Sequence, residues 1–306
     1  LIEGHSGVRE ISLFDASDYP VRIAAEVPDW NDTHLVGLPP SSARQTAFAL
    51  SAALQAFEHA GLQPGTCNPL RLGVYLGCGE IYPDFQRFAT AVARSMDAGQ
   101  LDRVRLFDVL QQDRDLANQC GQEPAAPVGL IAAQLDAQGP CINYTTACVS
   151  SSIAIGEAAE LIRRGTTDVM LTGGAHSMIH PFGLTGFLGL STLTMQAGDP
   201  ARAYRPFDRE RDGFVVGEGG IVFVLEDAER AKQRGAQIWA EVAGYGATQD
   251  AFRICDPRPD GASAARAIQL ALDDAEIAAQ DVGYINAHGS GTVLNDRVET
   301  AAVKSA

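Results

Sequence analysis

The stretch CINYTTACVSSS, residues 141–152, indicates the fold of its surroundings and contains the first chemical group of interest. Gly139 and Pro140 break the preceding element, and the short β-branched and aromatic run Cys141–Thr146 predicts a strand. Three serines follow Cys148 and are typical helix caps, and apolar residues at helical spacing then continue as far as Gly165. The sequence therefore predicts a strand, a sharp turn that carries a cysteine, and a helix.

Cys148 lies where this helix is expected to begin. Backbone N–H groups of the first helical turn point outward there, and the helix dipole favours a thiolate by lowering the pKa of the thiol. A thiolate at neutral pH is the requirement for a sulfur nucleophile. The alternative is a buried and inert cysteine, which is a common fate of a thiol outside disulfides.

Composition excludes several classes of protein. The chain has 306 residues, a formal net charge of -15 and 46% hydrophobic residues, which is typical of a globular protein and argues against nucleic-acid binding. Its 6 cysteines form neither a CxxC pair nor a zinc-binding spacing, so we expect reduced thiols in the cytoplasm. The sequence has no apolar run long enough for a membrane span and no signal peptide, so no membrane association is expected.

Strand and helix patterns alternate along the chain, which predicts an α/β fold with layers of helices on a sheet. We expect 80–123 to be a polar surface excursion, and 214–225 to be a pair of strands or one kinked strand. The other predicted strands are Arg71–Cys78, Asp168–Gly174, Ile238–Ala247 and Val282–Ala287. The other predicted helices are 41–60, closed by Gly61, then Pro124–Ala137, Asp227–Gln233 and Ala262–Ala275, and one that contains Glu299.

A second chemical group lies in YINAHGSGT, residues 284–292, where His288 follows a predicted buried strand. Glycines allow a ligand to approach the backbone, and the hydroxyls of Ser290 and Thr292 can bind a polar chain. Asn295 or Asp296 is expected to cap the next helix. His288 could instead only bond the backbone at a strand end. Because carboxyl ends of strands meet at the ligand crevice of α/β folds, we expect Cys148 and His288 to converge.

Three segments carry a family resemblance. TACVSS at 146–151 resembles the nucleophile motif of β-ketoacyl-[acyl-carrier-protein] synthases, AYRPFDRERDGFVVGEGG at 203–220 resembles their glycine-rich segment, and NAHGSGT at 286–292 resembles their first histidine motif. The sequence is closer to the elongating synthases than to initiating ones or to thiolases. The resemblance implies a thiolase-like, duplicated α/β/α layered sandwich, with the nucleophile in a half at 1–235 and an incomplete second half at 236–306. It also implies a homodimer or a ketosynthase heterodimer.

The resemblance also implies a decarboxylative condensation. Cys148 would accept an acyl group from acyl carrier protein, and His288 would stabilise the enolate made from malonyl carrier protein. Ser290 and Thr292 would bind the phosphopantetheine arm, and no separate cofactor is expected. Asp296 and Glu299 would be supporting residues, with Glu299 paired to a lysine. That lysine, a second histidine and a gate loop have no match here, so we expect a truncated chain or one that works with a complementing polypeptide.

Weaker signals and rival functions accompany this interpretation. His176 and His180 are four apart, but no third ligand lies nearby, so no metal site is expected. The arginines between 202 and 211 form either a solvated loop or a dock for an acidic carrier protein. A partner subunit would lack Cys148, and Cys255 has a poor context for the second cysteine of a thiolase. A catalytically incomplete fragment that serves as a structural or acyl-binding protein stays open.

Overall fold

A computed structural model of the chain describes residues 4–33, 35–39, 42–79, 85–112, 123–196 and 198–306. The chain forms two compact units, each made of segments that are far apart in the sequence. The first unit comprises Asp29–Phe182 and Gly219–Ala236, and the second comprises Leu1–Pro28, Gly183–Glu218 and Gln237–Ala306. The expected division into halves at residue 235 stays a prediction.

The first unit is built on a sheet whose strand order is β6-β3-β7-β8. β3 pairs in parallel with both β6 and β7, and Val74 lies opposite Cys141 on one side and Leu171 on the other. All residues of β3 are buried, as expected for a parallel strand covered on both faces. The strands are β3 (Leu72–Cys78), β6 (Cys141–Tyr144), β7 (Val169–Ser177) and β8 (Glu218–Glu226).

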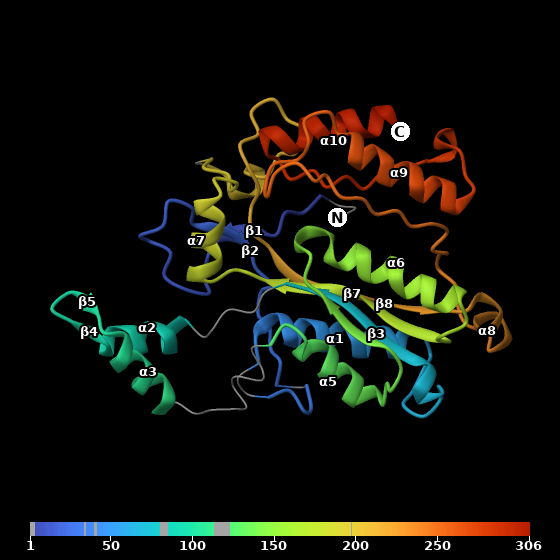
Figure 1. Ribbon diagram of the computed structural model, residues 1–306, viewed down its shortest axis with the longest axis horizontal. Helices are drawn as coiled ribbons and strands as arrows, with labels where there is room; N and C mark the ends of the chain where they lie inside the picture. The colour runs from blue at the N-terminus through green and yellow to red at the C-terminus, as the bar shows by residue number, and fades with distance from the viewer. Residues whose placement is uncertain (1–3, 34, 40–41, 80–84, 113–122, 197) are drawn as a thin grey trace. The chain divides into compact units, whose positions relative to one another are not determined.

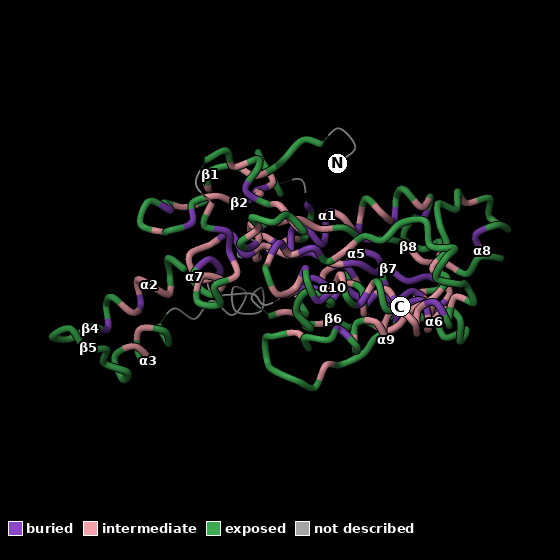
Figure 2. Tube along the Cα trace, turned by 90° about the horizontal axis from the view of Figure 1, so that it is seen from above, coloured by how far each residue is buried: buried purple, intermediate pink, exposed green. Residues whose placement is uncertain are grey.

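Helices cover both faces of this sheet (Figure 1). α6 (Ser150–Arg163) packs on β3 and β7 from one side, whereas α1 (Arg44–His59) and α5 (Ala126–Leu135) pack together on the other side. The short α8 (Ala228–Gln233) follows β8, and the carboxylate of the preceding Asp227 caps its N-terminus. Figure 2 shows buried residues along β7, between these helices. The first unit is therefore the predicted α/β/α sandwich.

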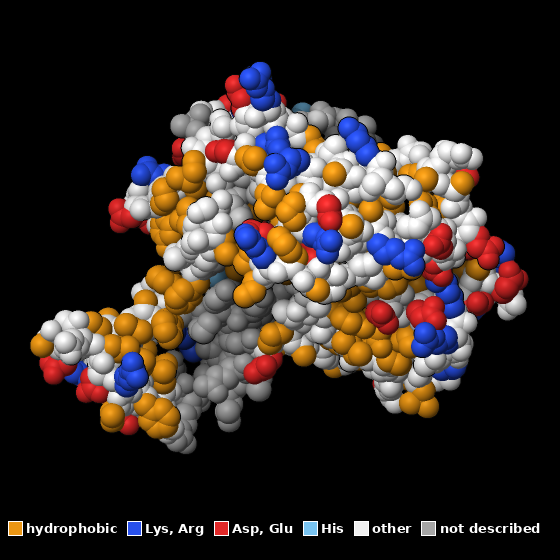
Figure 3. All heavy atoms as spheres, turned by 45° about the horizontal axis from the view of Figure 1, so that its top comes forward, with side chains coloured by type: hydrophobic (Ala, Val, Ile, Leu, Met, Phe, Trp, Pro, Cys, Tyr) orange, Lys and Arg blue, Asp and Glu red, His pale blue; other side chains and the backbone are white. Residues whose placement is uncertain are grey.

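The expected excursion at 80–123 contains a helical hairpin; its residues 80–84 and 113–122 lie outside the described residues. The hairpin exposes apolar side chains, among them Val104 and Phe107. Figure 3 shows hydrophobic side chains gathered on its surface. The surface of the hairpin is thus less polar than the predicted polar excursion. The elements are α2 (Phe85–Arg94), β4 (Met96–Asp97), β5 (Gln100–Leu101) and α3 (Arg103–Gln112).

The second unit contains an antiparallel strand pair and a pair of packed helices, α9 and α10. Its strands and helices are β1 (Val8–Glu10), β2 (Ile23–Ala25), α9 (Ala262–Ala275) and α10 (Val293–Ser305), and α7 (Pro181–Gly189) begins at its boundary. Short 3-10 turns lie at Pro200–Arg202 and Ala279–Asp281 in this unit, and at Pro69–Arg71 and Ala147–Val149 in the first unit. Among the described parts of the chain, every helix is too short or too polar to cross a bilayer.

Two strand predictions in the second unit are wrong. The described segments Ile238–Ala247 and Val282–Ala287 form no strand, and Tyr284 is largely exposed. The backbone near Gly244 packs on α9 instead. A Cβ at Gly244 would lie only 2.3 Å from the carbonyl oxygen of Ala271 in that helix. An apolar run cannot by itself distinguish these outcomes, since a strand also needs a neighbouring strand for its backbone hydrogen bonds.

Most other boundaries agree with the sequence. α9 has the predicted bounds, and Gly61 follows α1 with φ +68°, the left-handed conformation that ends many helices. α1 begins at Arg44 rather than at 41–42, of which residue 41 lies outside the described residues. The predicted strand at 214–225 begins only at Glu218, whereas Phe214 forms an isolated bridge with Leu193.

Candidate active site

The turn between β6 and α6 presents Cys148 at the surface. Cys148 is exposed and lies in the 3-10 turn Ala147–Val149, which runs directly into α6. Ala147 has φ +53°, a left-handed conformation that costs a residue with a Cβ about 1–2 kcal/mol. This bend lets the chain leave the strand, carry the cysteine and enter the helix within a few residues.

Ser150 closes this turn, which corrects the prediction that the serines cap the helix. Its hydroxyl accepts a hydrogen bond from the amide of Thr146 at 2.8 Å and donates one to the carbonyl of Ala147 at 2.7 Å. The helix cap itself is Val149, which has no side-chain capping bond. A serine therefore stabilises the cysteine turn from inside, and the bond to Ala147 helps to hold its unusual conformation.

Two glycines allow the start of α6 to lie directly on the sheet. A Cβ at Gly77 of β3 would lie 2.2 Å from the amide nitrogen of Ser151, and one at Gly174 of β7 would lie 3.0 Å from the Cβ of Ser151. Contacts under about 3.0 Å are not tolerated by real Cβ atoms, so only glycine fits at position 77. The height of Cys148 above the sheet is thus determined by the glycines beneath its helix.

Asn143 ties the ends of β6 and β3 together and was not singled out from the sequence. Its side chain accepts from the amide of Cys78 at 3.0 Å and donates to the carbonyl of Cys78 at 3.1 Å. The hydroxyl of Thr145 donates to the same carbonyl at 3.2 Å. An amide side chain inside the predicted strand Cys141–Thr146 was the signal that could have identified this role.

The surroundings of the other thiols differ from those of Cys148. Burial raises the pKa of Cys78 to about 11, and partial desolvation of the sulfur raises the pKa of Cys141. Both side chains therefore stay protonated at neutral pH. No disulfide forms among the described cysteines, which are Cys67, Cys78, Cys141, Cys148 and Cys255. A lowered pKa for Cys148 stays a prediction from its place before a helix.

In the second unit, Glu299 supports the loop that carries His288. His288 is exposed, and its amide donates to one carboxylate oxygen of Glu299 at 2.6 Å. The amide of Gly289 donates to the other oxygen at 2.8 Å, and the side-chain amide of Asn295 lies 3.3 Å from it. Glu299 thereby fixes two successive backbone amides of the loop. Its expected pairing with a lysine stays a prediction.

Thr292 caps α10, which corrects the prediction that Asn295 or Asp296 does so. Its hydroxyl oxygen accepts from the amide of Asn295 at 3.2 Å. The hydroxyl of Ser290 lies 3.0 Å from that of Thr292, and either can be the donor. Binding of a phosphopantetheine arm by these two hydroxyls stays a prediction, and such a ligand would have to join this existing network.

Asp296 is almost completely buried beneath the same loop. Its carboxylate accepts from the amide of Phe207 at 2.7 Å and from the amide of Gly291 at 3.1 Å, and it forms an ion pair of 3.3 Å with Arg211. Charged hydrogen bonds of this kind offset the cost of burying a carboxylate. Asp296 therefore connects the histidine loop to the segment 204–213.

The arginine-rich stretch between 202 and 211 is only partly a surface feature. Arg211 is largely buried and bonds to Asp296, which contradicts its placement in a solvated loop. Arg205 reaches Glu210 and the carbonyl of Arg202 within its own turn. The sequence analysis did not predict the burial of Arg211, because its partner Asp296 lies 85 residues further along the chain. The sequence RPFDRERDG at 205–213 gave one indication of this burial, because acids and arginines alternate there.

Cys148 belongs to the first compact unit and His288 to the second. Their expected convergence stays a prediction. Each of them is exposed and lies ahead of a helix, as its position in the sequence predicted: Cys148 before α6 and His288 before α10.

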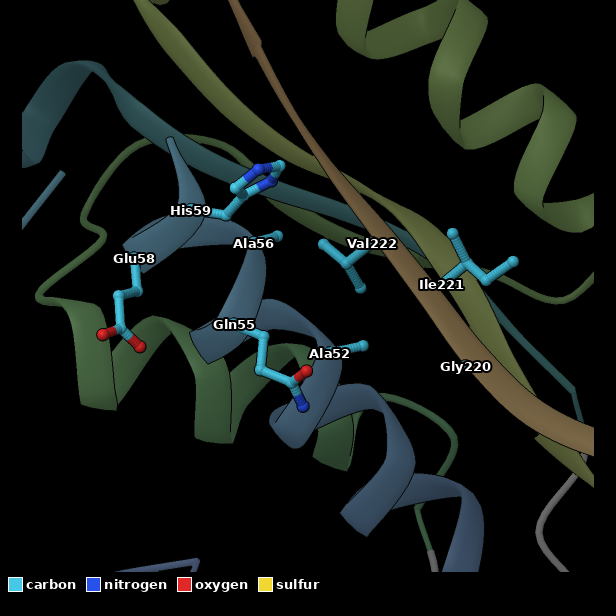
Figure 4. A pocket seen from close by; sticks show the side chains of 8 residues that line it. All are labelled: Ala52, Gln55, Ala56, Glu58, His59, Gly220, Ile221 and Val222. Carbon is cyan, nitrogen blue, oxygen red and sulfur yellow. The ribbon is translucent and has the colours of Figure 1, made fainter. Parts of the chain in front are cut away.

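A shallow groove of about 630 Å³ runs between α1 and β8 in the first unit (Figure 4). Its ionisable lining residues are Glu58 and His59, and Cys148 does not line it. The described residues also contain no cluster of three metal-ligating side chains. His180 lies beside His176, and burial lowers its pKa, which favours the neutral imidazole. Neither feature adds a second candidate centre for covalent chemistry.

Two protein-family models match the chain, and between them they include both candidate residues. The model of the family "Beta-ketoacyl synthase, N-terminal domain" matches residues 1–231, and that of "Beta-ketoacyl synthase, C-terminal domain" matches residues 239–306. The chain belongs to the β-ketoacyl synthase family. Cys148 lies in the part matched by the first model and His288 in the part matched by the second.

Relatives of this β-ketoacyl synthase come from two kinds of pathway. It is 39% identical to the ketoacyl synthase alpha subunit of the tetracenomycin polyketide synthase of Streptomyces glaucescens, over 99% of this chain and 70% of that protein. It is 37% identical to a 3-oxoacyl-[acyl-carrier-protein] synthase 2 of Synechocystis, over 100% of this chain and 71% of that protein. The prediction of the family from three short motifs is therefore confirmed.

Solved structures confirm the thiolase-like α/β fold of the family. A β-ketoacyl synthase from Burkholderia phymatum matches with a TM-score of 0.85 and 30% identity, covering 99% of this chain and 71% of that one. A type II polyketide ketosynthase solved with its acyl carrier protein and a bound hexaketide matches with a TM-score of 0.83 and 30% identity, with the same coverage. An acyl carrier protein is thus a partner of a structural relative.

Proposed function

We propose that this protein is a β-ketoacyl-[acyl-carrier-protein] synthase that builds carbon chains in fatty acid or polyketide biosynthesis. The observation that carries the proposal is the exposed Cys148, held in a turn at the start of α6 and above the ends of parallel strands. A thiol in that position has the requirements of an acyl-accepting nucleophile: access for a substrate and outward-pointing amides beside it.

In the first step, the Cys148 thiolate attacks the carbonyl carbon of an acyl thioester on acyl carrier protein. A bond forms between the Cys148 sulfur and the acyl carbon, the bond to the carrier sulfur breaks, and the carrier thiolate takes up a proton. The backbone N–H of Cys148 donates a hydrogen bond to the oxyanion that develops in this step. The acyl group is then stored on the protein.

In the second step, malonyl carrier protein loses CO2 and its bonding electrons form an enolate. His288, as a neutral imidazole, donates a hydrogen bond to the enolate oxygen. The enolate carbon attacks the acyl-Cys148 carbonyl, the carbon–sulfur bond breaks, and the Cys148 thiolate is regenerated with release of a 3-ketoacyl carrier protein. Glu299 and Asp296 contribute by holding the backbone of the histidine loop.

The substrates of this reaction are carried on the phosphopantetheine of acyl carrier protein, with Ser290 and Thr292 as the residues that bind the arm. The chemistry then needs neither a metal nor a resident cofactor. The chain has a formal net charge of -15, so an acidic carrier protein would need a local basic patch. In the α2–α3 hairpin, a groove of about 570 Å³ supplies one, because Arg87, Arg94 and Arg105 line it without any acidic residue.

We further propose that the protein works in the cytoplasm as a dimer, either of two copies or with a related ketosynthase chain. The strand β6 lies at the edge of the sheet and leaves Ile142 partly exposed. An exposed strand edge favours pairing with another chain. Sedimentation of the purified protein tests this, and a concentration-independent monomer would contradict it.

Transfer of an acyl group tests the central proposal. The protein is incubated with acyl carrier protein loaded with a labelled acyl chain, and intact mass with peptide mapping locates the label. We expect one acyl group on Cys148, none on the Cys148→Ala variant, and normal loading of the matched Cys255→Ala variant, whose exposed thiol has no assigned role. Absence of any acylation in the wild type would instead favour a structural or acyl-binding role for this fold.

A further inference from the structure

The side chain of Arg211 bonds to four groups next to the histidine loop. Its guanidinium donates to the carbonyl of Thr292 at 3.3 Å, to the carbonyl of Val293 at 3.0 Å and to the carbonyl of Asp208 at 2.8 Å. It also forms the 3.3 Å ion pair with Asp296, and the two side chains are 16% and 1% exposed. All of these partners belong to the second compact unit.

Three of the four acceptors of Arg211 lie at the junction between the histidine loop and α10. The carbonyls of Thr292 and Val293 belong to the cap and first residue of the helix, while Asp296 accepts from the amide of Gly291 inside the loop. Glu299 holds the amides of His288 and Gly289 from the same helix. Arg211 thereby fixes the start of the helix whose carboxylates fix the loop.

The segment around Arg211 also packs directly against the loop. The hydroxyl of Tyr204 donates to the carbonyl of Gly289, and a Cβ at Gly289 would lie 3.3 Å from the ring of Phe207. Gly291 has φ +74°, and a Cβ there would lie 2.6 Å from the carbonyl oxygen of Gly213. The loop is therefore enclosed by the 204–213 segment on one side and by α10 on the other.

We infer that Arg211 is a positioning residue for His288, acting through Asp296 and the start of α10. The inference rests on the proposed function, in which His288 stabilises an enolate. A hydrogen-bond donor for a developing charge is effective only if it is held in place before the charge appears. Arg211 does not touch substrate; it restricts the conformations of the loop that aims the imidazole.

This role requires an arginine, because the four acceptors lie in different directions around one side chain. One planar guanidinium carries five N–H donors in a fixed fork and can serve three carbonyls and a carboxylate at once, whereas the lysine ammonium is a compact point charge on a flexible stem. Arg211→Lys keeps the charge opposite Asp296 but loses part of the fork. Arg211→Gln removes the charge and leaves a buried carboxylate without its cation.

Hydrogen–deuterium exchange tests the positioning directly. In Arg211→Lys and Arg211→Gln, amides of residues 286–296 should exchange about tenfold faster or more, the scale expected for lost hydrogen bonds to charged groups. Exchange of residues 141–152 should stay unchanged. Arg209→Lys is the matched control, because Arg209 is exposed and forms no ion pair with described residues. Unchanged exchange at 286–296 in both Arg211 variants would overturn the inference.

Two activity assays separate positioning from general damage. Release of CO2 from malonyl carrier protein should fall about tenfold or more in both Arg211 variants, while acyl loading of Cys148 stays within about twofold of wild type. Equal losses in both reactions, or faster loop exchange with unchanged CO2 release, would overturn a positioning role. If the wild type itself neither loads acyl groups nor releases CO2, the proposed function fails, whereas the exchange data still decide whether Arg211 holds the loop.

Discussion

Gly77 of β3 lies directly beneath the backbone of Ser151, close enough that a Cβ at position 77 would reach within 2.2 Å of the Ser151 amide nitrogen. The first turn of α6 therefore rests on the sheet with no side chain between them. Since Cys148 lies three residues before Ser151, this contact determines where the thiol emerges. Backbone packing thus supports the candidate nucleophile from below, in addition to the hydrogen bonds of Ser150 inside the turn.

Gly77→Ala should displace the start of α6 and destabilise the protein by about 1–3 kcal/mol, the usual cost of overpacking a filled site. The rate of Cys148 alkylation should change as well, because the turn moves with the helix. Gly129→Ala is the control, since Gly129 lies within α5 with nothing within 4 Å of the added Cβ. Urea unfolding measures both variants; equal stability of Gly77→Ala and wild type would contradict the packing argument.

Cys148 should be the most reactive thiol of the chain. Limiting iodoacetamide at neutral pH, followed by peptide mapping, should label it ahead of Cys78, whose pKa is raised to about 11 by burial. Cys67, whose sulfur lies 3.7 Å from Nη2 of Arg230, and the exposed Cys255 are the competing thiols. Preferential labelling of Cys67 or Cys255 in the folded protein would show that the turn before α6 does not activate its cysteine.

His288→Ala should impair malonyl decarboxylation far more than acyl loading. Loss of one donor to a developing oxyanion typically costs about 10²–10³ in rate, whereas the thiolate character of Cys148 depends on its own helix. Separate assays of CO2 release and acyl-enzyme formation measure the two steps. His59→Ala, in the groove between α1 and β8, is the control. Equal losses in both steps would refute this division of labour.

The ion pair between Arg71 and Asp168 should make stability depend on pH in the acidic range. The hydrogen bond from Arg71, 2.6 Å long, lowers the pKa of Asp168 below its usual 3.8. The stabilisation is fully present above about pH 4, the ordinary range of an unfolded aspartate, and is lost as pH falls through the lower folded value. Both side chains are about a third exposed, so solvent screens the pair and its contribution to stability is small.

Asp168→Asn should therefore be less stable than wild type between about pH 5 and pH 7, and the difference should shrink below about pH 4. Thermal unfolding across this range measures it. Asp18→Asn, at an exposed carboxylate that forms no ion pair with the described residues, should show no such difference. A constant gap down to pH 2 would mean that Asp168 acts through packing rather than charge.

Local patterns predicted much of the first unit. β3 and the first half of β7 are largely apolar and buried, which is what parallel strands covered on both faces require, and α6 follows Cys148 as its spacing indicates. The predicted strands Ile238–Ala247 and Val282–Ala287 are wrong, and most of their residues are exposed. An apolar run predicts a buried strand, but it does not show whether a neighbouring strand is present to pair with its backbone groups.

The sequence by itself determined the family, the two candidate reactive residues and the local order of strand, turn and helix around Cys148, because these depend on side-chain types and spacings within short stretches. Only the tertiary structure showed that Gly77 supports Ser151 and that Arg211 is buried against Asp296. Such relationships join residues more than seventy positions apart. The environment that makes a glycine obligatory or an arginine internal comes from distant parts of the chain, and no local pattern encodes it.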